Sequence, residues 1–103
     1  MSSRRELLME LLAETPNDGE LLYSLGMESV SEENDIQAIA EFRKALEADP
    51  GHVASYLQLG QALVRHGEEG EAREIYTQGM EAARKAQNHH AFSEQSGFRD
   101  ALG

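Results

Sequence analysis

The chain repeats itself every 34 residues, and this period limits the folds it can adopt more than any other feature of the sequence. A shift by one period places bulky residues on bulky residues and small residues on small ones. The matched pairs are Pro16 with Pro50, Leu22 with Tyr56, Leu25 with Leu59, Gly26 with Gly60, Ala38 with Ala72, Phe42 with Tyr76 and Ala45 with Gly79. Because residue size recurs in register, the period indicates copies of one structural unit stacked side by side.

Each copy carries the pattern of two helices joined by a short turn. In the first copy, apolar residues follow helical spacing up to residues 33–35, where polar capping side chains interrupt it, and the spacing then resumes as far as Leu46. Asp49-Pro50-Gly51 separates the two copies, because proline lacks an amide donor and disfavours a helical residue before it. The sequence therefore predicts an all-α protein made of antiparallel helical hairpins.

Gly26 and Gly60 indicate where the two helices of each hairpin come close together. A glycine inside a helix costs about 1 kcal/mol relative to alanine, so two glycines in matching positions imply a packing requirement. We expect the missing side chains to leave room for Phe42 and Tyr76, which would fill the space between the helices.

These residues resemble the tetratricopeptide repeat family, and in particular its small bacterial members. The family pattern of Trp or Leu, Leu-Gly, Ala, Phe or Tyr, Ala and Pro is filled in the first copy by Leu22, Leu25-Gly26, Ala38, Phe42, Ala45 and Pro50. The resemblance implies a single domain over residues 1–103, folded as a right-handed stack of helical hairpins. Its two full repeats would span residues 19–52 and 53–86, after an N-terminal half-repeat helix at residues 4–14 and before a C-terminal capping helix at residues 89–103.

The chain departs from the family pattern at three places. Leu22 and Tyr56 stand where the family often has Trp, and Glu33 replaces the usual turn glycine of the first repeat. Arg84 replaces the closing proline of the second repeat, so we expect that helix to continue to about Asn88.

The resemblance also implies a binding surface, because the first helix of each repeat lines a concave groove in this family. Carried over residue by residue, the peptide-binding positions are Glu20, Tyr23, Met27, Val30, Ala54, Leu57, Gln61, Val64 and Arg65. A surface helix usually keeps such a face polar, whereas these positions are largely apolar. The surface would suit an amphipathic helix or an extended peptide with bulky side chains.

Charge narrows the partners that the chain can bind. The net charge is −10, which repels phosphate backbones and argues against nucleic acid. Residues 1–52 hold four Lys or Arg and twelve Asp or Glu, so the first half carries −8 of this charge. The expected partner is a protein or peptide, and its basic residues would meet the first half of the chain; a solvated acidic surface that aids solubility explains the same charge and is favoured over a specific basic ligand.

Two alternatives compete with an open peptide groove. The terminal helices could cover its apolar side chains, and so short a stack could form a homodimer through its groove or its bare end. A role as an accessory subunit of an enzyme is the least favoured reading, because it would need a pocket of perturbed titrating groups that the sequence does not show.

No residue set in the sequence points to catalysis, a metal or a cofactor. The chain has no cysteine, and the adjacent His89 and His90 would point about 100° apart on a helix. No nucleophile elbow or phosphate-binding glycine pattern occurs. We therefore predict a protein that is not an enzyme.

No apolar run reaches the roughly 18 residues that a membrane helix needs, so the sequence predicts no membrane association through a spanning helix. The first residues, through Arg5, resemble the start of a signal peptide, but the apolar stretch that follows is short and broken by Glu10. A cytoplasmic location is the expectation.

Overall fold

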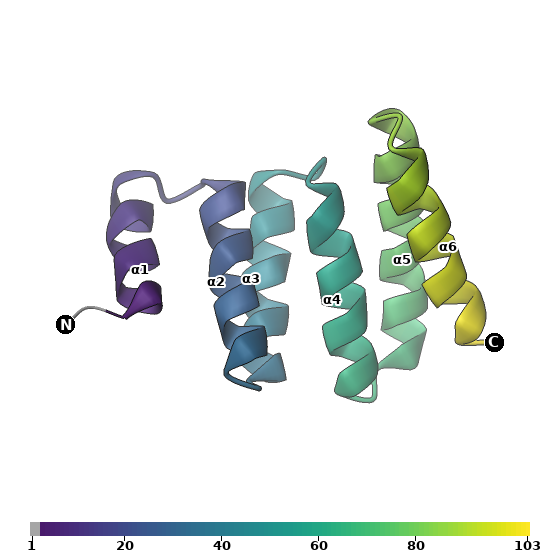
Figure 1. Ribbon diagram of the computed structural model, residues 1–103, viewed down its shortest axis with the longest axis horizontal. Coiled ribbons are helices and arrows are strands. Elements are labelled where there is room, and N and C mark those ends of the chain that lie inside the picture. Colours follow the sequence, from purple (N-terminus) through teal and green to yellow (C-terminus); the bar gives the residue numbers. More distant parts are fainter. Residues whose placement is uncertain (1–2) are drawn as a thin grey trace.

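The computed structural model describes residues 3–103, which contain six α-helices and no strand. Figure 1 shows the helices standing side by side in chain order, from α1 at one end of the array to α6 at the other. The array measures 44 × 29 × 19 Å. The helices are α1 (Arg4–Glu14), α2 (Gly19–Ser31), α3 (Asp35–Ala48), α4 (Val53–Arg65), α5 (Glu69–Lys85) and α6 (His89–Ala101).

Four helices begin directly after a residue whose side chain accepts a hydrogen bond from a backbone amide of the first turn, and at α1 this residue is Ser3, which accepts from Glu6. Asp18 accepts from Leu21 at the start of α2, and Asn34 and Asn88 do the same at the starts of α3 and α6. These bonds satisfy amides that have no partner within the helix. Short polar side chains in the sequence thus fix where the hairpins turn.

The turns that end α2, α4 and α5 share one backbone geometry. Glu33, Gly67 and Gln87 have φ angles of 59°, 84° and 56°, in the left-handed region. After each, the next residue donates a backbone hydrogen bond to a carbonyl five residues earlier, as from Asn34 to Ser29. Glu33 therefore takes the family's glycine position without a change of turn. The same reversal at Gln87 ends α5 at Lys85, so the expected continuation to Asn88 is wrong.

The core lies where the two hairpins meet, and the matched small residues explain how closely the helices approach. Phe42 and Tyr76 are buried, with 0% and 1% of their surface exposed. A Cβ atom added to Gly26 would overlap the ring of Phe42, and one added to Gly60 would overlap the ring of Tyr76. The expectation that these glycines make room for the aromatic rings is confirmed.

The terminal helices flank the hairpins, α1 against α2 and α6 mainly against α5. At the C-terminal end, Arg73 of α5 donates hydrogen bonds to the backbone oxygens of Leu102 and Gly103, at 3.0 and 3.1 Å. Phe98 stacks on Tyr76, with 6.0 Å between ring centroids. These contacts join α6 to the second hairpin at the place expected for a cap.

Candidate peptide-binding surface

The nine residues predicted to bind a peptide all lie on α2 and α4, the first helices of the two hairpins. Glu20, Ala54 and Arg65 are exposed, and the remaining six are half-buried. Five of the half-buried side chains pack against the core cluster, namely Tyr23, Met27, Val30, Leu57 and Val64. These five side chains therefore support the fold as well as forming part of its surface.

A histidine that the sequence reasoning left without a role links the two helices of this surface. His52, just before α4, bonds through Nε2 to Glu20 Oε1 of α2 at 2.6 Å and through Nδ1 to Ser55 Oγ at 2.8 Å. Its ring also lies 4.9 Å from the ring of Tyr23, between centroids. The repeat held the signal for this residue, because His52 stands one period after the N-cap residue Asp18.

Glu20, His52 and Ser55 form a chain of acid, imidazole and hydroxyl, the order found in hydrolase triads. Ser55, however, is fully buried in the first turn of α4, with 0% of its surface exposed. A nucleophile must reach a substrate carbonyl, and this hydroxyl does not reach the surface. The contacts of His52 therefore serve to hold α2 and α4 in register.

Both charged members of the surface contact a polar side chain elsewhere in the fold. Glu20 meets His52, and Arg65 Nε lies 3.0 Å from Asp35 Oδ1 at the start of α3. The Arg65 side chain is 41% exposed, and an ion pair at such a position contributes little to stability, about 0–1 kcal/mol. Arg65 can therefore exchange its present partner for a ligand group at little cost to the fold, whereas the bond between Glu20 and His52 also joins α2 to the start of α4.

Five clefts that open among the described residues are lined by residues other than the nine predicted ones. The most apolar of these clefts, of about 420 Å³, lies between α1 and the first hairpin, with Met9, Leu12 and Leu25 in its wall. The assignment of the α2 and α4 surface as the binding site therefore stays a prediction.

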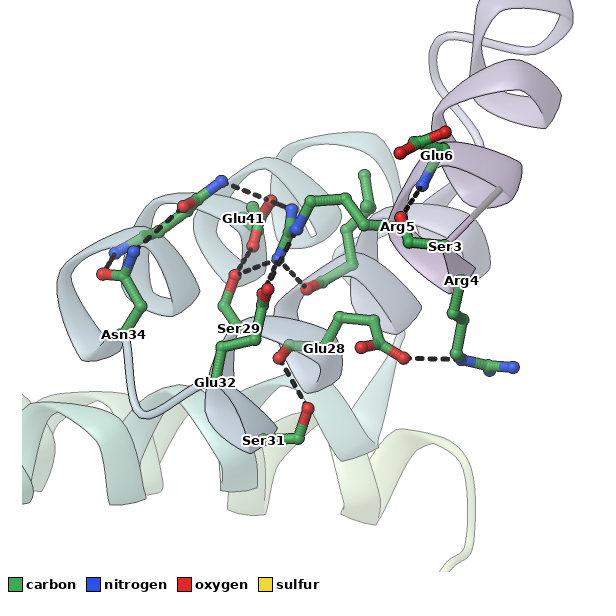
Figure 2. A network of polar contacts seen from close by, with 12 residues as sticks. Ser3, Arg4, Arg5, Glu6, Glu28, Ser29, Ser31, Glu32, Asn34 and Glu41 are labelled. Carbon is green, nitrogen blue, oxygen red and sulfur yellow. Dashed lines mark hydrogen bonds and ion pairs between the residues drawn. The ribbon is translucent and has the colours of Figure 1, made fainter. Parts of the chain in front are cut away.

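A polar network fastens α1 to the first hairpin, and sequence reasoning did not find it (Figure 2). Arg5 donates to Glu41 at 2.8 Å, to Ser29 at 2.6 Å and to Glu32 at 2.9 Å, and the Ser29 hydroxyl donates to Glu41. The hydrogen bond that Arg5 donates to the Glu41 carboxylate raises the pKa of Arg5 above its ordinary value.

The signal for this network is a break in the repeat. Ile39, Leu63 and Ile75 stand one period after Arg5, Ser29 and Glu41, and all three pack in or against the apolar core. The same three repeat positions are thus polar where α1 meets the first hairpin and apolar where the first hairpin meets the second. The contact between α1 and the first hairpin therefore depends on these polar partners, because a part-buried charge that loses its partner is strongly destabilising.

Across residues 3–103, no three His, Asp or Glu side chains are grouped so that they could hold a metal ion. None of the six helices combines the length and the apolar character needed to cross a membrane. The polar clusters at His52 and Arg5 are accounted for by contacts between helices.

A row of helical hairpins, with small residues at each crossing and flanking helices at the ends, defines a helical-repeat protein of the solenoid class. The family model of the tetratricopeptide repeat matches residues 32–95, and the chain belongs to this family. The predictions of an all-α stack of hairpins and of this family are confirmed. The repeat is in general a protein–protein interaction module.

Solved structures share the fold over most of the chain. A solution structure of a tetratricopeptide repeat domain protein from Salinibacter ruber has a TM-score of 0.79 and 30% identity, with 84% of this chain and 88% of that chain covered. A crystal structure of a tetratricopeptide repeat domain protein from the same organism has a TM-score of 0.77 and 29% identity, with 82% of this chain and 94% of that chain covered. The solution structure of a Bordetella parapertussis protein has a TM-score of 0.83 and 26% identity, with 99% of this chain and 89% of that chain covered. No curated protein matches the chain.

Proposed function

We propose that the chain is a binding module whose α2 and α4 surface takes a peptide or helical segment from another protein. The observation that carries the proposal is the run of half-buried apolar side chains on the first helices, where a surface helix is ordinarily polar. Met27 adds adaptability, because its unbranched thioether chain adjusts to differently shaped ligands. A ligand that covers these side chains removes their exposed apolar surface from water, and this burial favours binding.

The charge of the surroundings favours a ligand with both bulky apolar and basic side chains. The first half of the chain carries −8, and Glu20 lies on the rim with 75% of its side chain exposed. Complementary charge speeds association and selects among partners more than it raises affinity. A neutral apolar peptide would therefore bind more slowly than a basic one.

The proposal is tested with a displayed peptide library and two matched lysine variants. Ala54 lies exposed on the proposed surface, and Ala40 lies exposed on α3, a helix that carries none of the nine predicted residues. For peptides enriched by the wild-type chain, Ala54→Lys should weaken binding in fluorescence anisotropy, and Ala40→Lys should leave it unchanged. Equal affinities of the two variants, or no enrichment of basic apolar peptides, would remove the support for this surface.

Self-association is the second candidate, and the exposure of apolar side chains favours the end of the stack over its groove. Leu7 and Leu11 of α1 are 50% and 54% exposed, whereas the apolar groove residues are half-buried and packed against the core. A homodimer would cover the end and would leave the α2 and α4 surface free.

A further inference from the structure

One flank of α1 carries a narrow stripe of four residues that faces solvent. Arg4, Leu7, Leu11 and Glu14 follow one another at spacings of three, four and three residues, which is the spacing of a coiled-coil seam. Leu7 and Leu11 are half exposed, and 68% of the Arg4 side chain is exposed. Figure 1 shows α1 at the end of the array, with α2 as its neighbour on one side only. The stripe is therefore available for an interaction.

The residues of the stripe do not suit another tetratricopeptide hairpin packed in the same manner. One period after Arg4 and Leu11 stand Ala38 and Ala45, which are 0% exposed and allow α2 to approach α3 closely. The larger side chains of Arg4 and Leu11 would prevent a helix from approaching α1 as closely as α2 approaches α3. A helix packed at the usual distance of 8–10 Å between axes is accommodated, because leucines can interdigitate at that distance.

The stripe is complementary to itself when two copies run antiparallel. In that orientation, with the helices centred on Met9, Arg4 stands opposite Glu14 of a second copy and Leu7 opposite Leu11 of that copy. The two-fold symmetry repeats both pairs, so the seam would hold four leucines between two ion pairs. This palindrome of charge and size is what a two-fold interface requires, since each patch must match itself.

We infer that α1 forms an antiparallel seam with α1 of a second copy of this chain. The inference rests on the self-association named above as the second candidate function, and it is independent of peptide binding to α2 and α4. The dimer is a weak one, because a seam of four residues on each side is far smaller than the roughly 800 Å² per partner of a standard interface. The net charge of −10 opposes association, although physiological salt screens charges more than about 8 Å apart.

Charge reversal provides the decisive experiment, with sedimentation velocity over a concentration series as the measurement. R4E places two acidic residues on each stripe, and E14R places two basic residues on each, so each variant alone should dissociate. An equimolar mixture restores both ion pairs and should form a heterodimer. Changing two exposed pairs from repulsion to attraction is worth about 1–2 kcal/mol, which is about tenfold in Kd.

Aspartate substitutions at two exposed apolar positions, one on the stripe and one outside it, provide the matched control. Leu7→Asp should abolish the dimer, whereas Ile36→Asp, at a side chain 69% exposed on α3, should leave it intact. Circular dichroism of each variant establishes that its helices are retained. Because Arg4 also contacts Glu28 of its own chain at 3.0 Å, the mixture and not R4E alone carries the conclusion.

Two results would overturn the seam, and they differ in what they say of self-association. A wild-type chain that stays monomeric throughout the concentration series would rule out both the α1 seam and self-association in general. A wild-type dimer that persists in Leu7→Asp, or two variants whose mixture associates no better than either alone, would place self-association on another surface. The Ala54→Lys comparison is read independently, because it measures binding of a peptide and not of a second copy.

Discussion

Replacing Gly60 by alanine sets the helix preference of one residue against the close packing of two helices. A Cβ atom built on Gly60 would lie 2.6 Å from Tyr76 Cζ and 2.8 Å from Cδ1, closer than real Cβ atoms come to other atoms. Tyr76 is 1% exposed, so its ring has no free space to move into. The new methyl group must therefore push α4 and α5 apart.

The expected change in stability follows from two opposing terms. Alanine improves the helix preference of this position by about 1 kcal/mol. Overpacking a filled core costs about 1–3 kcal/mol, and contact with several atoms of a rigid ring places Gly60→Ala near the upper value. We expect a net destabilisation of about 1–2 kcal/mol, equivalent to a fall of roughly 4–16 °C in Tm for a domain of this size.

Gly97→Ala is the matched control, because a Cβ atom at this position inside α6 would meet no atom within 4 Å. The same substitution should there raise stability by up to about 1 kcal/mol. Urea unfolding with a shared m-value measures both changes. If Gly60→Ala proves as stabilising as Gly97→Ala, the hairpin is not held by the contact between Gly60 and Tyr76, and the packing argument for the repeat is refuted.

Three further predictions concern a turn, a polar network and a tyrosine. Glu33→Gly should raise the urea midpoint by an amount equivalent to about 0.5–1 kcal/mol, because glycine adopts the φ of 59° without strain, and a lower midpoint would contradict this. Arg5→Ile should lower the free energy of unfolding by about 2–3 kcal/mol in thermal unfolding, because Glu41 and Ser29 lose their partner; the usual cost of breaking a buried pair is reduced here because 20% of the Arg5 side chain is exposed. Adding Ser29→Leu and Glu41→Ile should restore or exceed the wild-type stability, and a triple variant no more stable than Arg5→Ile would contradict this. Burial raises the pKa of Tyr76, so the folded state favours the neutral phenol, and its contribution to stability should be lost only as the pH rises past about 10. The Tyr76→Phe variant should therefore lose less stability than the wild type above that pH, and a pH dependence of Tm that is the same in both proteins would exclude this cause.

The fold could be predicted from the sequence because its signals are local and repeated. The contact between Gly26 and Phe42 recurs one period later between Gly60 and Tyr76. Each copy of the repeat therefore carries the signal for the same contact between two neighbouring helices. Most contacts of such an array join adjacent elements, so the spacing along the chain translates directly into packing.

The candidate binding surface could be predicted only in part. The sequence placed Tyr23, Met27 and Leu57 on the first helices of the hairpins, where the structure has them. It gave no indication of how far each side chain is drawn into the core, because burial depends on the distance between helices and not on position within one helix. The same limit hid the contacts of His52, whose two partners come from different helices.

By itself, the sequence determined the period, the helical hairpins and the absence of cysteine chemistry, since each follows from the order and kind of residues along the chain. Only the tertiary structure decided that Arg5 reaches Glu41 across α2 and that Leu7 and Leu11 remain exposed. The physical reason is that hydrogen bonds and exposure depend on separations in space between segments far apart in the chain, which come into being only when the helices have packed.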